Sequence, residues 1–365
     1  MKICLEYYAR SAPELEVIDL SPDERLASSK LGRKILREII YPLKIRSRAK
    51  RYTRLGRRPI LHVIDHSYGH LCRFWTPAVV TCHDLNHYVC PSLKGTELLN
   101  WKFRVRGMLS AARIIAVSHH LAGEITSFLK IPPERITVAY NGVDSDVFSI
   151  GTAMEAAERF PHLAELRKGH RLVLNIGTNA GRKNLPTLLR AIARLKHERR
   201  LPVKLMKAGS SLTNDGFGPL IEKLGIEGEV IELGLQRPEA VAALCRLAHA
   251  LAFPRLNEGF GRPTIEAQAA GLVCVLADSS CMREVGGEGA LYHEPLDDQQ
   301  LAAQLEIAMT NEELRQRLIG DGYANAKRFT WHAHVRKLVD VYAEVAAKQC
   351  RSQELQESRS SGGKR

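Results

Sequence analysis

The sequence lacks several features that would each define a class of protein. Its eight cysteines form no C-x-x-C pair, so a zinc site is not expected, and we expect buried free thiols in a reducing cytoplasm. No apolar run approaches the roughly 18 residues of a transmembrane helix, and the N-terminus turns polar before a signal-peptide core could form. Aromatic residues make up only 6% of the chain, which leaves few stacking platforms for nucleic acid bases.

What is present indicates a globular protein of two domains. The chain has 365 residues, of which 45% are hydrophobic and 25% charged, and this is the composition of a folded protein. A single core rarely grows beyond roughly 250–300 residues, so we expect two domains. The net charge of +13 predicts an anionic partner, which could be nucleic acid, a membrane surface or a phosphorylated ligand.

Short apolar runs alternate with amphipathic helical patterns along most of the chain. Continuous apolar strands separated by helices of this length predict parallel sheets that are covered on both faces, and hence an α/β fold. Ligands of such sheets bind beyond the carboxyl ends of the strands. The expected strands are 59–65, 78–82, 113–117, 136–139, 171–176, 203–208, 229–233, 250–253 and 273–277.

The alternation is interrupted once, and this break predicts the domain limits. We expect an N-terminal domain over residues 1–150, a linker over 151–170 and a second domain over 171–330. Apolar residues at helical spacing predict a long last helix, assigned here to 331–349. The remaining tail, 351–365, has few apolar residues and is expected to be disordered.

The densest motif, residues 257–267, follows the predicted strand 250–253 and leads into a helix. Gly259 and Gly261 allow the backbone to approach a ligand closely, and Pro263 suits the start of a helix. The free N–H groups at such a helix start favour an anion such as a diphosphate. Glu258 and Glu266 lie on either side of this turn, and Glu266 is expected to accept hydrogen bonds from sugar hydroxyls.

The two glutamates, with seven residues between them, resemble the E-x(7)-E signature of glycosyltransferase family 4. Further segments resemble landmarks of the same family in the same order, over about residues 60 to 345. These segments are 81–85 (T-C-H-D-L), 116–118 (A-V-S), 138–148 (V-A-Y-N-G-V-D through Phe148), 175–185 (N-I-G through R-K-N-L), 272–277 (L-V-C-V-L-A) and 283–286 (R-E-V-G).

The resemblance implies the GT-B fold, in which two Rossmann-like, doubly wound domains face a cleft and the last helix crosses back to the N-terminal domain. It also implies an enzyme that transfers a sugar from a nucleotide-diphosphate sugar with retention at the anomeric carbon and without a metal or other cofactor. The Arg-Lys-Asn turn is frequent among mannosyltransferase-like members, so GDP-mannose is the expected donor and a UDP-sugar the alternative. The expected role is hexose transfer to a lipid-linked or glycan acceptor in cell-surface polysaccharide or lipopolysaccharide biosynthesis.

Family roles carry over to the motif residue by residue. The first glutamate of the pair contacts the donor sugar and the second binds the nucleotide ribose, which assigns these roles to Glu258 and Glu266. The backbone N–H groups of Phe260, Gly261 and Arg262 would hold the distal phosphate. The resemblance therefore predicts that Glu258→Ala abolishes turnover while the protein stays folded.

Two more candidate groups follow other strands. Gly177 and the cation Lys183 belong to the turn after strand 171–176, where Lys183 would stabilise the leaving diphosphate. Many relatives carry arginine directly after the first glycine of this turn, where this chain has Thr178, so that role has either moved to Arg182 or been lost. His83 ends strand 78–82 and would face the donor sugar as a catalytic residue.

Two weaker patterns complete the set of candidates. Gly69 and His70 follow another strand end and are expected on the acceptor side. The D-x-D pattern at 144–146 matches the metal motif of other glycosyltransferases, but it lies in the segment that resembles the family's N-G-V-D landmark, so no metal site is predicted there.

Most of the positive charge lies in one segment. Residues 30–58 contain twelve lysines and arginines and one acid, Glu38, and so carry +11 of the chain's +13. Isoleucine and leucine interleave with these bases at near-helical spacing, a pattern typical of a helix on a membrane surface. We expect peripheral binding to the inner, cytoplasmic face of the cytoplasmic membrane, and a solvated basic helix packed on its own domain is the alternative.

Two other classes of protein fit parts of the pattern. One is a nucleic-acid-binding protein that uses segment 30–58, where Tyr41 and Tyr52 are the only aromatic residues. Salt-sensitive RNA binding without sugar transfer would favour it. The other is a different GT-B enzyme, such as a sugar epimerase or a phosphorylase, which product analysis would distinguish. A phosphorylase would in addition need a lysine for pyridoxal phosphate and a longer chain.

Overall fold

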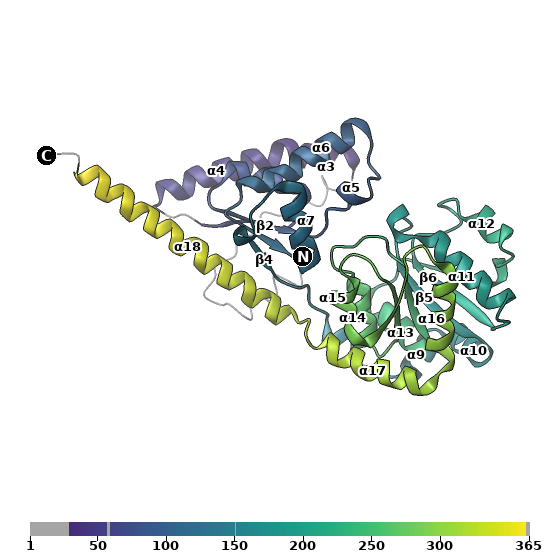
Figure 1. Cartoon of the computed structure of the whole chain (residues 1–365). Coiled ribbons are helices and arrows are strands. Elements are labelled where there is room, and N and C mark those ends of the chain that lie inside the picture. The colour runs from purple at the N-terminus through teal and green to yellow at the C-terminus, as the bar shows by residue number, and fades with distance from the viewer. Residues whose placement is uncertain (1–28, 57–58, 150, 363–365) are drawn as a thin grey trace. The chain divides into compact units, whose positions relative to one another are not determined.

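The computed structural model describes residues 29–56, 59–149 and 151–362, and the chain divides into two compact units (Figure 1). Unit 1 consists of Met1–Tyr140 together with Trp331–Arg365, and unit 2 is the continuous stretch Asn141–Thr330. Each unit is built around one sheet whose strand pairs are all parallel. This confirms the predicted α/β class.

Unit 1 has a four-stranded sheet in the order β1-β2-β3-β4. The central strand β2 is buried at every position, because its run of alanine, valine, threonine and cysteine is covered on both faces. The described elements of unit 1 are α3 (Lys30–Ile35), η1 (Leu36–Ile40), α4 (Tyr41–Arg54), β1 (Leu61–Val63), η2 (His66–Phe74), β2 (Ala78–Cys82), α5 (Asn86–Val89), α6 (Gly95–Arg106), η3 (Gly107–Ser110), β3 (Arg113–Ala116), α7 (His119–Leu129), η4 (Pro133–Arg135), β4 (Ile136–Val138) and α18 (Trp331–Gly362).

Unit 2 has a six-stranded sheet in the order β10-β9-β8-β5-β6-β7. Its elements are α8 (Ser145–Phe148), α9 (Ala153–Arg159), α10 (Pro161–Gly169), β5 (Arg171–Gly177), η5 (Gly181–Lys183), α11 (Leu185–His197), β6 (Val203–Gly209), α12 (Gly218–Lys223), η6 (Glu227–Glu229), β7 (Val230–Gly234), α13 (Pro238–Leu247), β8 (Ala250–Phe253), α14 (Arg262–Ala269), β9 (Cys274–Ala277), α15 (Met282–Gly286), η7 (Gly287–Gly289), β10 (Ala290–His293), α16 (Asp298–Thr310) and α17 (Glu312–Ala326).

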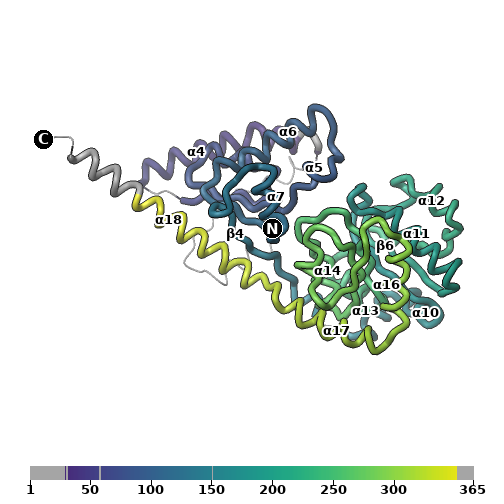
Figure 2. Tube along the Cα trace, viewed as in Figure 1, coloured from purple at the N-terminus to yellow at the C-terminus, as the bar shows by residue number. Residues whose placement is uncertain are grey.

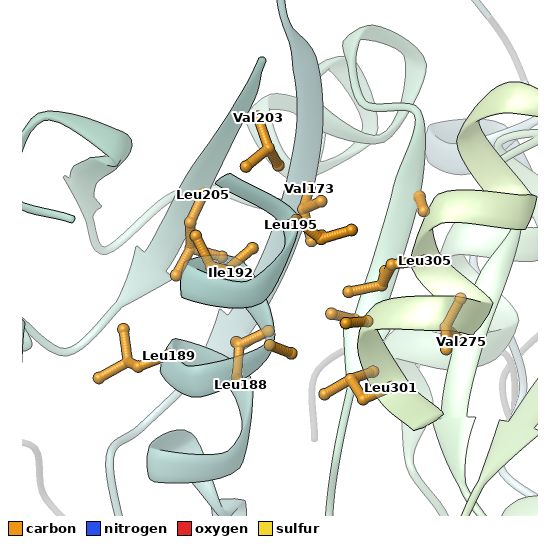
Figure 3. Packing of buried hydrophobic residues seen from close by; sticks show 14 of the residues in the cluster. Val173, Leu188, Leu189, Ile192, Leu195, Val203, Leu205, Val275, Leu301 and Leu305 are labelled. Carbon is orange, nitrogen blue, oxygen red and sulfur yellow. The ribbon is translucent and has the colours of Figure 1, made fainter. Parts of the chain in front are cut away.

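One buried cluster holds unit 2 together. Helix α11 places apolar residues at helical spacing, among them Ile192 and Leu195, against Val173 and Leu205 of the sheet (Figure 3). Leu301 of the neighbouring helix α16 belongs to the same cluster. Burying such a side chain stabilises the fold by roughly 1.5–3 kcal/mol. The cluster therefore holds the strands of unit 2, and the loops that follow them, on a rigid support.

The predicted domain limits need a correction. The chain passes from unit 1 to unit 2 between Tyr140 and Asn141, so residues 141–150 belong to unit 2. The predicted linker 151–170 forms the helices α9 and α10, which pack against α13 of unit 2. A capping box between Thr152 and Glu155 starts α9. Residues 151–170 lack a strand pattern, but the capping box in their sequence was a local signal for a helix.

The last helix, α18, belongs to unit 1, as the sequence predicted for residues 331–349 (Figure 2). Its Val335 and Leu338 pack against Val79 and Ile115 of the sheet. The prediction of a disordered tail over 351–365 is wrong for residues 351–362, because α18 continues to Gly362. That stretch contains no proline and no glycine before Gly362, and its glutamine, glutamate, leucine and arginine residues are good helix formers.

The described part of the basic segment is helical from Lys30 to Arg54, with a π-helical turn between α3 and α4. Leu36 and Ile45 are buried against unit 1, whereas Ile39 and Leu43 remain more than half exposed. Residues 57 and 58 of the segment lie outside the described residues. Among the helices described, none is both long enough and apolar enough to span a membrane.

Candidate functional site

The strand order of unit 2 brings two loops together at one edge of its sheet. β5 and β8 are neighbours in the sheet, although β6 and β7 lie between them in the sequence. The chain therefore leaves β5 on one side and returns on its other side. In open α/β sheets, ligands bind at such a switch point, outside the carboxyl ends of the strands. Residues 178–184 follow β5 there, and residues 254–261 follow β8.

Hydrogen bonds fix the shape of the loop after β5. The backbone N–H of Lys183 donates to the Ala180 carbonyl at 2.7 Å. Asn184 then adopts a left-handed conformation, with φ 53°. Its side-chain amide donates to the Pro295 carbonyl at 2.6 Å, and its side-chain oxygen accepts from the Thr187 hydroxyl at 2.9 Å. Lys183 is thereby held at the start of α11 with its side chain buried.

The loop after β8 is tied to the loop after β5 and to the loop after β9. The Leu256 N–H donates to the Arg182 carbonyl at 2.9 Å. The Glu258 N–H donates to the Ser280 hydroxyl at 3.2 Å, and the Cys281 thiol donates to the Glu258 carbonyl at 3.2 Å. Contacts with these two loops therefore hold the segment around Glu258 in place.

The side chain of Glu258 lies beside positively charged residues of the loops after β5 and β8. The Lys183 ammonium donates to its Oε1, and Arg182 Nη1 lies 3.1 Å from the same oxygen. Arg255 Nη1 lies 3.6 Å from it. The carboxylate itself is only 13% exposed. The structure thus brings together three residues that the sequence singled out, Lys183, Arg182 and Glu258.

Arg255 was missed by the sequence analysis. Its side chain is 2% exposed and lies over the Phe253 ring, 4.1 Å from the ring centroid. Its Nη2 donates to the Ile176 carbonyl. Burial lowers the pKa of the guanidinium to about 10, although the nearby Glu258 raises it. An arginine directly after the apolar stretch 250–254 was the available signal, but nothing in the sequence indicated that it would turn inward.

Lys207 was missed as well. It is buried in β6, and its ammonium donates to the Gly177 carbonyl at 2.5 Å. Burial, and after it the charge of Arg255, lowers its pKa to about 8. Gly209 passes so close that a Cβ there would lie 2.2 Å from the Gly177 oxygen. Both glycines have φ above +120°, so these two strand ends require glycine.

The protonation of Lys183 is sensitive to its burial. Desolvation is the largest effect and lowers the pKa of its ammonium to about 8. Arg255 and Arg182 lower the pKa further, whereas the Glu258 carboxylate raises it. An anion that replaces water beside this lysine would favour the charged form. The buried position of the Lys183 ammonium therefore suits a cation that pairs with a bound anion.

Helix α14 starts at the predicted motif. Gly261 precedes it with φ +80°, and a Cβ there would lie 2.6 Å from Met282 Cε. The buried Phe260 ring packs edge-on against Phe329, with ring centroids 5.6 Å apart. Arg262 Nη2 donates to Glu266 Oε1 at 2.9 Å. Burial raises the pKa of the Glu266 carboxyl, and Arg262 opposes this shift.

His83 lies at the carboxyl end of β2 in unit 1. It is exposed, and its Nε2 bonds the Ile64 carbonyl at 2.9 Å. Its backbone N–H donates to Nδ1 of the buried His66 at 3.3 Å. Asp65 and Asp84 flank His66 at 3.7 and 4.0 Å. His66 is therefore a further polar residue at this edge, and its position after strand 59–65 was the available signal.

Gly69 and His70 lie inside unit 1, and their predicted role on the acceptor side remains a prediction. Both are buried in the 3-10 helix η2. A Cβ on Gly69 would lie 2.9 Å from Met108 Cγ, and Nε2 of His70 bonds the Arg37 carbonyl at 3.2 Å. Gly69 therefore lies against α6 and η3, and His70 lies against η1, in the interior of unit 1. A position shortly after a strand did not by itself place Gly69 and His70 at the exposed carboxyl end of the sheet.

No metal centre can be built from the part of the chain that the structure describes. Within residues 29–56, 59–149 and 151–362, no three histidine, cysteine or acidic side chains are grouped to hold an ion. Asp144 and Asp146 of the D-x-D pattern lie at the start of the short helix α8. The sequence-based prediction that catalysis requires no metal remains a prediction.

Family models match the chain in two successive stretches. "Glycosyltransferase Family 4" matches residues 7–147, and "Glycosyl transferases group 1" matches residues 157–325. Among individual relatives, O-antigen chain mannosyltransferase B of Escherichia coli is 28% identical over 73% of this chain and 70% of its own length. The MMP alpha-(1->4)-mannosyltransferase of Mycolicibacterium hassiacum is 28% identical over 64% of this chain and 54% of its own length.

Solved structures share the architecture at low sequence identity. HepE of Anabaena in complex with UDP superimposes with a TM-score of 0.73 at 17% identity, over 94% of this chain and 96% of that one. WaaG, a glycosyltransferase involved in lipopolysaccharide biosynthesis, gives a TM-score of 0.63 at 16% identity, over 86% and 96%. At these identities the likeness establishes the fold alone.

Proposed function

Because the chain belongs to the family 4, group 1 glycosyltransferases and has their GT-B fold, we propose that it is a retaining, metal-independent hexosyltransferase. The donor is a nucleotide-diphosphate sugar, and GDP-mannose is preferred over UDP-sugars. The acceptor is a lipid-linked saccharide or a glycan in cell-surface polysaccharide biosynthesis. Support for mannose comes from relatives named as mannosyltransferases, and the UDP alternative rests on HepE.

The observation that carries this proposal is the group of cations at the switch point of unit 2. When the bond between the sugar C1 and the phosphate oxygen breaks, negative charge grows on the leaving diphosphate. Lys183 and Arg182, which face one another across Glu258, stabilise that charge in a site largely shielded from water. Glu258 faces the positive charge that develops on the sugar.

Retention follows from attack on the same face of the sugar. In this scheme the acceptor hydroxyl gives its proton to the leaving phosphate oxygen as its own oxygen bonds to C1, so no enzyme nucleophile is needed. His83, exposed at the sheet edge of unit 1, contributes a hydrogen bond to the sugar. Glu266 binds the ribose, and the backbone N–H groups at the start of α14 hold the distal phosphate.

A nucleotide screen tests the choice of donor. We expect millimolar GDP to raise the melting temperature of the protein by several degrees and UDP to raise it less, because a ligand that binds only the folded state stabilises it. Incubation with GDP-mannose and an acceptor extract should then yield a mannosylated product with the α-anomeric configuration of the donor. If neither nucleotide shifts the melting temperature and no sugar is transferred or released, the proposed function is wrong.

We further propose that unit 1 binds an anionic membrane. Ile35, Ile39 and Leu43 recur every four residues along the helix α3–η1–α4, and they are 37%, 54% and 61% exposed. Leu99 and Phe103 of α6, 66% and 59% exposed, lie on a helix that an Arg104–Glu38 ion pair of 3.5 Å joins to η1. We call these five side chains the apolar stripe.

Charge complementarity selects the partner of this stripe. Exposed bases of the same helix accompany it, including Arg33, Lys34, Arg46, Lys50, Arg51 and Arg54. Each base near an anionic leaflet contributes about 1 kcal/mol, and apolar side chains that enter the interface add to this. This combination fits a bilayer that contains acidic lipids and places a lipid-linked acceptor within reach of unit 1.

Flotation with vesicles tests the membrane proposal. We expect the protein to float with vesicles of phosphatidylglycerol and phosphatidylcholine at low salt, and to float less at 0.5 M salt because charges are screened. The double variant Ile39→Asp, Leu43→Asp should bind these vesicles at least tenfold more weakly. Met154→Asp in unit 2, where the methionine is 70% exposed, is the matched control. Absence of flotation at low salt, or equal binding by the double variant, contradicts the proposal.

A further inference from the structure

Three cations converge on a single carboxylate oxygen in the structure. Glu258 Oε1 contacts Lys183 and Arg182 and forms an ion pair with Arg255. All four side chains are at most 23% exposed. Removing charges from water is costly unless they are well paired, and here one negative charge faces three positive ones. The cluster therefore has an excess of positive charge in a setting that disfavours it.

Arg255 has further capacity to bind an anion. Its Nη2 donates to the Ile176 carbonyl, but its Nε and Nη1 are buried and make no hydrogen bond within the described residues. Buried donors are nearly always paired, and an unpaired one costs roughly 1–3 kcal/mol. A guanidinium is also the cation whose planar geometry best matches the oxygens of a phosphate.

The position of Arg255 fits the same need. Its guanidinium lies against Gly177, where a Cβ would approach Nη2 to 3.0 Å. The side chain that reaches this space in this chain comes from the other loop, after β8, and is held there by the Phe253 ring.

We propose that Arg255 is a third cation for the donor diphosphate, and that Glu258 is an internal anion that the diphosphate displaces. This rests on the proposed function, because it identifies the diphosphate as the group that enters the cluster. Before the diphosphate binds, the carboxylate balances part of the positive charge of Lys183, Arg182 and Arg255. The more highly charged diphosphate takes over these contacts, and the released carboxylate turns to the sugar.

The exchange reconciles two requirements on one residue. A carboxylate beside a leaving diphosphate would repel it, yet the sugar needs a carboxylate close by. Glu258 moves from the cations to the sugar only when the diphosphate binds. Its negative charge therefore pairs with the three cations before binding, and with the positive charge that develops on the sugar afterwards. The affinity for the diphosphate is reduced by the work of breaking the three ion pairs.

Inorganic pyrophosphate and nucleoside diphosphates provide the test, because they lack the sugar. We expect Glu258→Gln to bind both at least several-fold more tightly than the wild type by calorimetry, since the competing anion is gone. Arg255→Met, which keeps an unbranched apolar stem over Phe253, should weaken binding roughly 10- to 100-fold, in line with the loss of hydrogen bonds to a charged group. Arg255→Lys should recover part of this loss.

Matched variants separate this result from a general effect of charge or folding. Arg283→Met removes an exposed arginine of unit 2 that pairs with Asp278 outside the cluster, and it should bind pyrophosphate as the wild type does. Pyrophosphate should raise the melting temperature more for Glu258→Gln than for the wild type. Circular dichroism establishes that each variant is folded before binding is compared.

Several outcomes overturn the inference. Equal or weaker pyrophosphate binding by Glu258→Gln shows that the carboxylate is not displaced, and unchanged binding by Arg255→Met shows that Arg255 is no ligand. If the wild type transfers sugar but Glu258→Gln binds pyrophosphate more weakly and Arg255→Met binds it more tightly, the inference is wrong and the proposed function stands. Pyrophosphate binding with the expected signs, but without any sugar transfer, contradicts the proposed function and leaves the anion exchange intact.

Discussion

Replacing Glu258 with alanine is expected to lower kcat for sugar transfer by about 10³-fold. In the proposed reaction the sugar carries its largest positive charge when the bond to the phosphate breaks, and Glu258 is the carboxylate that the loop after β8 holds beside Lys183 and Arg182. An interaction made mainly in the transition state affects kcat more than KM. Initial rates with saturating donor and acceptor measure the effect.

A control keeps this expectation specific. Glu288→Gln removes the charge of an exposed glutamate elsewhere in unit 2 and should leave kcat within twofold of the wild type. Because Glu258→Ala also leaves Lys183 and Arg255 without their partner, a lower melting temperature is expected with a retained circular dichroism spectrum. Turnover near the wild-type rate in Glu258→Ala would remove Glu258 from the catalytic residues.

The second large effect is expected at Lys183. Lys183→Met should lower kcat about 10²- to 10³-fold, because the charge of the leaving diphosphate then loses the ammonium that lies beside Glu258. Lys168→Met, on a lysine that is 75% exposed, is the matched control. If the variant binds the donor more weakly but keeps its kcat, Lys183 contributes to ground-state binding of the donor and not to stabilisation of the transition state.

The pH dependence follows from the same lysine. The ammonium is protonated below its lowered pKa of about 8, so kcat/KM, which reports the free enzyme, is expected to fall as the pH rises through about 8. Lys207 has a pKa lowered to about 8 as well, so a variant must distinguish the two. Lys183→Arg should shift the alkaline limit upward. A limit that stays at the same pH assigns it to another group.

The sequence was sufficient for those parts of the site that lie within one motif. Glu258 and Gly261 belong to a stretch whose glycines, proline and paired glutamates already define a turn into a helix. Lys183 was identifiable because it follows a strand end. In each case, residues close in the sequence determine the local shape, so the pattern carries the information.

The residues that the sequence missed depend on contacts between distant segments. Arg255 reaches Gly177 because β5 and β8 are neighbours in the sheet, and strand order is not visible in a single sequence. Lys207 resembles any lysine in a strand until β6 places it beside the Gly177 carbonyl. The burial of Gly69 and His70 in η2 was likewise not visible in the sequence.

The path of the chain has a consequence for the order in which the enzyme folds during synthesis. Unit 2 is continuous, whereas unit 1 is completed by α18, whose Val335 and Leu338 cover the sheet. Val143 and Thr330, where the chain enters and leaves unit 2, form a parallel bridge. As the nascent chain emerges from the ribosome, unit 2 has all its strands while the earlier sheet still lacks its last helix. The later segment therefore completes its sheet first, and a nascent unit 1 exposes apolar surface until α18 has emerged and packed against it.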